Sequence, residues 1–168
     1  MSTQPSHPSR MPPAESEGNL SLEDAASYML EECRMVLPGI QSLFGFQLIA
    51  VFNQAFSTRL SGFEQKLHLG AIVLVVVSIA LVMAPAALHR QREPRSVSEN
   101  FLAVSSRLLL WSMLPLALGI SLDVFLVSRV ILRSSTGALA LAGVLFGVFV
   151  LLWYGLPRRR VMRRLAQR

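Results

Sequence analysis

The stretch LGAIVLVVVSIALVMAPAAL, residues 69–88, decides the fold class of this chain. It holds no charged residue and one hydroxyl group, that of Ser78. A helix needs about 20 apolar residues to cross a hydrocarbon core of about 30 Å. Lipid offers no hydrogen-bond partner to the backbone, so a spanning segment must be a helix or part of a closed barrel. Residues 69–88 therefore predict a transmembrane helix.

Three more windows resemble this one: residues 36–56, 108–127 and 137–157. Together they carry a single charge, Asp123. Charged residues make up 15% of the chain, against about a quarter in soluble proteins. A soluble bundle would need helices with a polar face, which residues 137–157 lack, and the alternating strands of a barrel are absent. The sequence predicts an all-α membrane protein, a four-transmembrane-helix bundle over residues 36–157.

The flanking segments have different compositions. Residues 1–20 contain four prolines and four serines and no apolar run, which is typical of a disordered tail; without the pattern of a cleaved signal, the first span is expected to stay as an anchor. Residues 21–35 have apolar positions at helical spacing and an acidic opposite face, which predicts an amphipathic juxtamembrane helix capped by Ser21. Residues 158–168 form a basic tail. We expect hinges at Pro38–Gly39 and at Pro115.

The arginines and lysines indicate the orientation in the membrane. Twelve of them fall on the side that holds both termini and four on the other side. Positive residues in short loops favour the cytoplasmic side. We therefore expect a multi-pass protein with both termini, and the amphipathic helix, in the cytoplasm.

Polar residues within the spans define a candidate intramembrane site. An ionisable residue in a span is a functional hypothesis by default, and Asp123 is the one such residue here. Either it has a structural role, hydrated or paired with Arg59, Arg129 or Arg133, or it takes part in transport or proton transfer. Amides of the first span at a similar depth are expected to bond between helices and to hold Asp123: Gln47, Asn53 and Gln54.

Small residues indicate helix packing. Gly119 shares one helical stripe with Ser112, Leu116 and Asp123, which suits a helix–helix seam. Gly143 and Gly147 form a GxxxG pair in the fourth span. We expect this pair to pack within the bundle, and contact between copies of the chain is the alternative.

Other classes of function find no support in the sequence. Cys33 is the single cysteine, and His7, His68 and His89 lie far apart, so no metal-ligand spacing appears. No nucleophile–base pair, phosphate loop or paired carboxylates occur in the spans. We expect neither enzyme activity nor a cofactor. The pI of about 11.0 comes largely from arginines beside the spans, so it gives no indication of nucleic-acid binding. The C-terminal arginines either bind anionic lipid or serve as topological anchors.

Three motifs carry a family resemblance: RMVLPGIQSLFGFQL at 34–48, MAPAALHR at 83–90 and LGISLDVFLV at 118–127. The chain resembles, from about residue 32 to 157, small bacterial four-span membrane proteins grouped as a domain of unknown function. The resemblance implies a bacterial inner-membrane protein and brings no established activity, substrate or cofactor. It also draws together a second candidate site, a cytoplasmic pocket for an anion or lipid headgroup, with ordinary anchoring at the interface as the alternative. Its residues would be Arg34, Gln41, His89, Arg90 and Arg107.

Two hypotheses for function remain from the sequence. The first is a non-enzymatic scaffold, subunit or regulator of a membrane process, with a membrane-protein partner or a second copy of the chain. The second is a small oligomeric ion carrier or proton-coupled solute transporter in which Asp123 titrates.

Overall fold

The computed structural model describes residues 21–92 and 98–156. The predicted disordered tail and basic tail lie outside these residues. The elements are α1 (Leu22–Val51), α2 (Gln54–Arg59), α3 (Gly62–Arg92), α4 (Glu99–Leu132) and α5 (Ser135–Val150), followed by a π-helical segment, η1 (Leu151–Gly155). Within the described part, four helices are long and apolar enough to cross a membrane. The prediction of an all-α bundle with four spans is confirmed.

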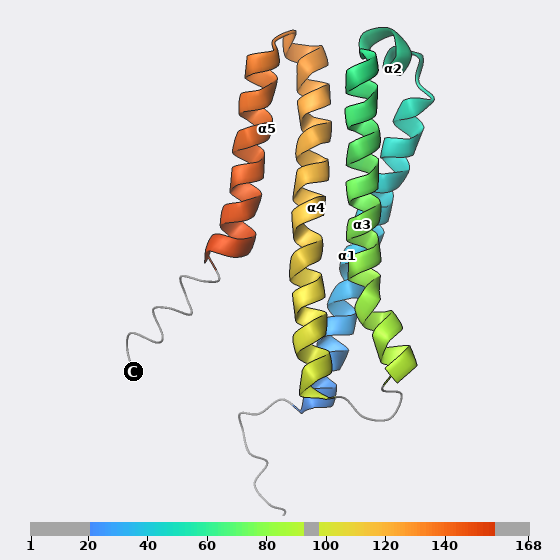
Figure 1. Ribbon diagram of the computed structural model, residues 1–168, viewed down its shortest axis with the longest axis vertical. Helices are drawn as coiled ribbons and strands as arrows, with labels where there is room; N and C mark the ends of the chain where they lie inside the picture. Colours follow the sequence, from blue (N-terminus) through green and yellow to red (C-terminus); the bar gives the residue numbers. More distant parts are fainter. Residues whose placement is uncertain (1–20, 93–97, 157–168) are drawn as a thin grey trace, which may run out of the picture.

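The helices pack side by side, as Figure 1 shows. α4 lies in the middle, with α3 on one side and α5 on the other. α1 packs mainly against α3 and makes a smaller contact with α4. The short helix α2 lies at the end of the bundle where α4 turns into α5. The polar residues near this end of α1, α3 and α4 can therefore meet.

Serine side chains cap three of the long helices. Ser21, Ser98 and Ser134 precede α1, α4 and α5, and each side-chain oxygen accepts a hydrogen bond from a backbone N–H three residues later, at 3.1, 3.2 and 3.3 Å. Such bonds satisfy donors that the first helical turn leaves unpaired. The cap expected at Ser21 is confirmed.

The predicted juxtamembrane helix is helical but is not a separate element. Residues 22–35 are the first half of α1, which continues through Pro38 without a break. A proline within a helix removes one backbone hydrogen bond, and packing against neighbouring helices compensates for it in membrane proteins. Ala26, Cys33, Ile40 and Gln47 are the buried positions of α1. They recur every seven residues, so one unbroken helix buries one continuous stripe. α4 likewise continues through Pro115.

The first apolar window ends earlier than predicted. α1 stops at Val51, and α2 begins at Gln54. The Asn53 side chain accepts a hydrogen bond from the backbone N–H of Ala55 at 2.9 Å and so caps α2. An asparagine that caps a new helix favours a break in the chain at that position. The window of residues 36–56 therefore contains a helix end, a cap and the start of a second helix.

The α3–α4 seam is built on small side chains. A Cβ atom at Gly119 would lie 3.1 Å from Val75 Cγ2 and 3.2 Å from the Ala71 carbonyl oxygen. The absence of a side chain there allows the two backbones to approach closely. The Ser78 hydroxyl donates to the Ser112 carbonyl at 2.9 Å across the same seam. The packing role predicted for Gly119 is confirmed.

The prediction that the GxxxG pair packs within the bundle is wrong. A Cβ atom at Gly143 or Gly147 would meet no atom within 4 Å. α5 instead buries Ala138 and Ala142. Every face of this helix is apolar, so its own sequence does not decide which face is buried, and packing against α4 does.

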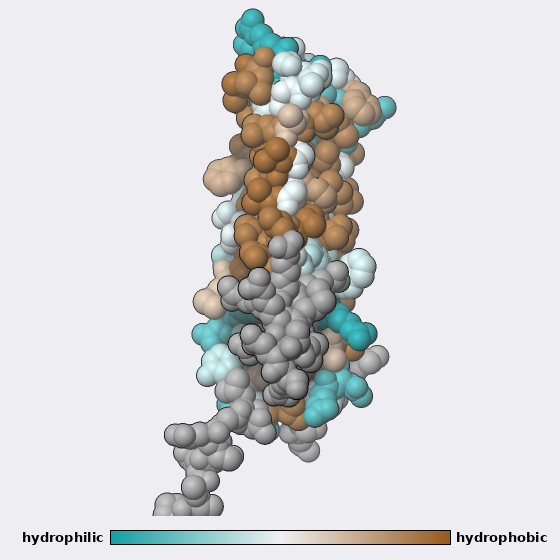
Figure 2. Space-filling model, turned by 90° about the vertical axis from the view of Figure 1, so that its left-hand side faces the viewer, coloured by the Kyte–Doolittle hydropathy of each residue, from teal (hydrophilic) through white to brown (hydrophobic). Residues whose placement is uncertain are grey.

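The outer surface of the bundle is hydrophobic in its middle part, as a surface in contact with lipid requires. Figure 2 views the side of the molecule on which α5 lies, and hydrophobic residues there form a band between hydrophilic residues near the two ends. Large exposed apolar side chains occur on α1, α3, α4 and α5, for example Phe46, Val73, Trp111 and Val144. This surface and the four spans make the chain a multi-pass membrane protein.

Candidate functional site

Three side chains from three helices meet near the α2 end of the bundle. The Gln47 amide nitrogen (Nε2) donates to Asp123 Oδ2 at 2.6 Å. His68 Nδ1 lies 3.1 Å from Asp123 Oδ1, and His68 Nε2 lies 3.0 Å from the Gln47 backbone carbonyl oxygen. We call Gln47, His68 and Asp123 the polar cluster. It joins α1, α3 and α4, with Gln47 and Asp123 inside predicted spans and His68 directly before the span of residues 69–88.

Each member lies where its helix is buried. Gln47 is the last residue of the seven-residue stripe of α1 and is 3% exposed. His68 continues a buried seam of α3 formed with Ala71, Val75 and Ser78. Asp123 lies one helical turn beyond Gly119 on α4, and at Gly119 α4 approaches α3 closely. The helix faces that pack the bundle thus also bring the cluster together.

The contacts of His68 restrict where protons can be. A backbone carbonyl oxygen accepts hydrogen bonds and donates none, so Nε2 must carry the hydrogen of its bond to Gln47. Nδ1 faces a carboxyl oxygen, and one proton between them completes the bond. This proton resides on Nδ1, giving an imidazolium–carboxylate pair, or on Asp123, giving a neutral pair. In both forms His68 and Asp123 together have no net charge, the cheaper condition in a buried site.

A cavity of about 390 Å³ lies beside the cluster. All three cluster residues line it, together with Asn53 and Arg59. The rest of the wall is apolar, and the Phe56 ring contacts His68 edge-on at 5.3 Å between ring centroids. Gln47 Oε1 is buried and has no hydrogen-bond partner among the described residues. A buried unpaired acceptor is a position that a donor group can satisfy.

His68 is the partner of Asp123 that the sequence analysis missed. Of the three arginines that were considered, Arg129 pairs with Glu64 at 3.0 Å instead, and Arg59 lines the cavity. The sequence contained a usable signal, because His68 stands at helical spacing from Ala71, Val75 and Ser78. That His68 lies beside Asp123 could not be known before the rotation of α3 about its axis was known.

The predicted amides have different positions. Gln47 holds Asp123, as expected. Asn53 caps α2 and lines the cavity. Gln54 is the first residue of α2, is exposed, and uses its backbone carbonyl to accept the hydroxyls of Ser57 and Thr58. The expected set of interhelical amides thus reduces to Gln47.

The second predicted site does not appear as a pocket built around buried groups. Arg34, Gln41, Arg90 and Arg107 are exposed on α1, α3 and α4. His89 is half-buried against Phe101, with 5.6 Å between the ring centroids. Among the residues that the structure describes, no three His, Cys, Asp or Glu side chains gather as a metal site.

The fold and the cluster define a class: a four-span helical membrane protein in which a glutamine, a histidine and an aspartate meet inside the bundle. The chain belongs to the Family of unknown function (DUF6328), whose model matches residues 22–157. This match confirms the predicted membership in a family of unknown function. No curated protein and no solved structure matches the chain.

Proposed function

We propose that this protein is a non-enzymatic, proton-responsive subunit or regulator of a process in a bacterial inner membrane, with both termini in the cytoplasm. The observation that carries the proposal is the contact of both His68 ring nitrogens with oxygen atoms, one of them on Asp123. Histidine is the side chain best suited to changing charge near neutral pH. The excess of arginine on the side of the termini supports the orientation.

The cluster is suited to respond because it holds the outer half of α1. Gln47 contributes both its side chain and its backbone carbonyl to Asp123 and His68. Removal of the shared proton would place a carboxylate against a nitrogen lone pair. Addition of a second proton would leave a buried imidazolium beside a neutral acid. Either change adds an uncompensated charge to a buried site and weakens the attachment of α1 to α3 and α4.

The experiment is the pH dependence of thermal unfolding in nanodiscs for the wild type and for Asp123→Asn. An asparagine side chain can accept from Gln47 and donate to His68 Nδ1, so the geometry is kept while the shared proton is lost. We expect the unfolding temperature of the wild type to be highest at one pH and to fall at both lower and higher pH, and we expect a flatter profile in the variant. Glu99→Gln, an exposed acid at the other end of α4, is the matched control. Superimposable profiles for the wild type and Asp123→Asn would reject the proposal.

A second function is a small proton-coupled carrier. The cavity beside the cluster and the unpaired Gln47 Oε1 favour it, because a substrate with a donor group could bind there. Against it, the core towards the other end packs Cys33, Ile40, Val75 and Val82 together. The buried polar side chains described there are the serines Ser78, Ser105 and Ser112, whose hydroxyls do not change charge near neutral pH, so they offer no second proton-binding group. A proton flux in reconstituted vesicles that Asp123→Asn abolishes would favour the carrier over the regulator.

A further inference from the structure

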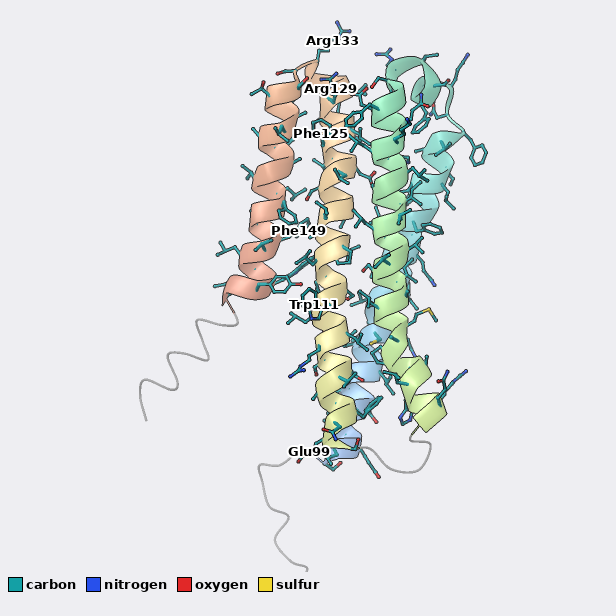
Figure 3. All side chains as sticks on the ribbon, viewed as in Figure 1. Glu99, Trp111, Phe125, Arg129, Arg133 and Phe149 are labelled. Atoms are coloured by element: carbon teal, nitrogen blue, oxygen red, sulfur yellow. The ribbon has the colours of Figure 1, made fainter. Side chains whose placement is uncertain are left out.

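A groove rich in arginine lies at the α2 end of the bundle, next to the cavity of the polar cluster. It has a volume of about 430 Å³ and is lined by Thr58, Arg59, Glu64, Arg129, Val130 and Arg133. These side chains come from α2, α3, α4 and the residue that ends α4. Figure 3 shows Arg129 and Arg133 near one end of α4, with Glu99 at the opposite end. Three arginines against one glutamate give the groove a positive charge.

The one acidic side chain in the groove already has its partners. Glu64 Oε2 accepts the backbone N–H and the hydroxyl of Ser61, both at 2.8 Å. Its other oxygen accepts Arg129 Nε at 3.0 Å, and an Arg129 terminal nitrogen donates to the Ser135 hydroxyl. Arg129 is thereby held in place. Arg59 and Arg133 have no ion-pair partner within residues 21–92 and 98–156.

Arg133 occupies a backbone conformation that favours glycine. Arg133 ends α4 with a positive φ of 53°, and its N–H bonds to the Arg129 carbonyl at 3.1 Å. Helices that end in this left-handed conformation usually have glycine there, because a side chain adds strain. An arginine at this position points to a use for its guanidinium.

The groove and the cavity adjoin each other. Arg59 and Val130 line both of them. From the groove, the walls change from arginine to apolar side chains such as Phe46, Leu126 and Val127. The arginines follow the apolar windows that end at residues 56 and 127, so they lie at the depth of the lipid headgroups. The combined site is cationic at the membrane boundary and apolar below it.

We propose that this site binds one anionic phospholipid, with its phosphate between Arg59, Arg129 and Arg133 and an acyl chain along the cavity. Guanidinium groups match the geometry of phosphate oxygens, and a lipid satisfies the cationic and the apolar parts together. The site would exist in either orientation of the chain in the membrane. It does not depend on the proton response of the polar cluster.

The test uses the full chain in phosphatidylcholine nanodiscs into which phosphatidylglycerol is titrated, with retained phosphatidylglycerol counted by native mass spectrometry. We expect Arg59→Gln and Arg133→Gly each to weaken binding about fivefold, the change that about 1 kcal/mol per surface arginine gives. Arg133→Gly also relieves the strained backbone, so its effect cannot be attributed to misfolding. Lys66→Gln, an exposed cation of α3 near the same end of the bundle that does not line the groove, is the control and should bind as the wild type does.

Three results would overturn the proposal. The first is equal retention by the wild type and both groove variants. The second is an equal loss in Lys66→Gln, which would mean a general effect of charge. The third concerns thermal unfolding of the protein in pure phosphatidylcholine nanodiscs. If inorganic phosphate stabilises the protein there as much as phosphatidylglycerol does, the groove binds a free anion and not a lipid.

Discussion

His68 Nδ1 and Asp123 Oδ1 lie 3.1 Å apart across the α3–α4 interface, although 55 residues separate them in the chain. The side chain of His68 is 8% exposed and that of Asp123 is 19% exposed. A buried carboxylate with a histidine and an amide as partners avoids the cost of an isolated charge. The pair is therefore a structural contact between α3 and α4, and the proposed proton response depends on it.

Replacing Gln47 by leucine should destabilise the bundle. The change removes the amide that donates to Asp123 Oδ2 and leaves a buried acceptor unpaired, at a cost of about 1–2 kcal/mol in a membrane protein. Thermal unfolding in detergent measures it. Gln41→Leu is a matched control, because Gln41 is an exposed amide on the same helix. An equal loss of stability in both variants would mean that the hydrogen bond to Asp123 contributes little.

Adding a methyl group at Gly119 should separate α3 from α4. The new Cβ would lie 3.1 Å from Val75 Cγ2 and 3.2 Å from a backbone oxygen of α3, so we expect Gly119→Ala to lose about 1–3 kcal/mol of stability. Gly143→Ala adds the same group in open space and should be neutral or slightly stabilising. The comparison is made by thermal unfolding. Similar unfolding temperatures for the two variants would mean that the α3–α4 seam is looser than described.

The pair of Glu64 and Arg129 should contribute a modest, salt-sensitive coupling. The Arg129 side chain is 38% exposed, and partly exposed pairs contribute about 0.5–1 kcal/mol. A double-mutant cycle with Glu64→Gln and Arg129→Gln measures the coupling. We expect it to fall as salt is raised from 0.05 to about 0.5 M, because screening weakens exposed charges. A coupling of zero at low salt would contradict the prediction.

The orientation predicts the activity of reporter fusions. Alkaline phosphatase, which is active outside the cytoplasm, should be inactive when fused after Arg168 and active when fused after Gly62, at the start of α3. The reason is the twelve positive residues on the side of the termini. A reporter that is active in the cytoplasm should give the opposite pattern at the same two positions. Activity of alkaline phosphatase after Arg168 would reverse the proposed topology.

The sequence by itself determined the class of the protein and the approximate position of its spans. Charge-free windows of about 20 residues are a local property, and the bilayer thickness converts them directly into helices. The depth of the polar residues also placed Asp123 near three amides of the first span, of which Gln47 makes the contact. The shared helical stripe of Gly119 and Asp123 indicated the seam in which Gly119 packs.

Only the tertiary structure decided which faces meet. Rotating α3 or α5 about its axis changes no local property of an apolar helix, so hydropathy could not show that His68 faces Asp123 or that Gly143 faces outward. The packing of small residues between α3 and α4 sets the rotation of α3, and that rotation places His68. The same holds for Arg129, which faces Glu64 across 65 residues of sequence, because the choice among charged partners depends on distances that only the assembled bundle defines.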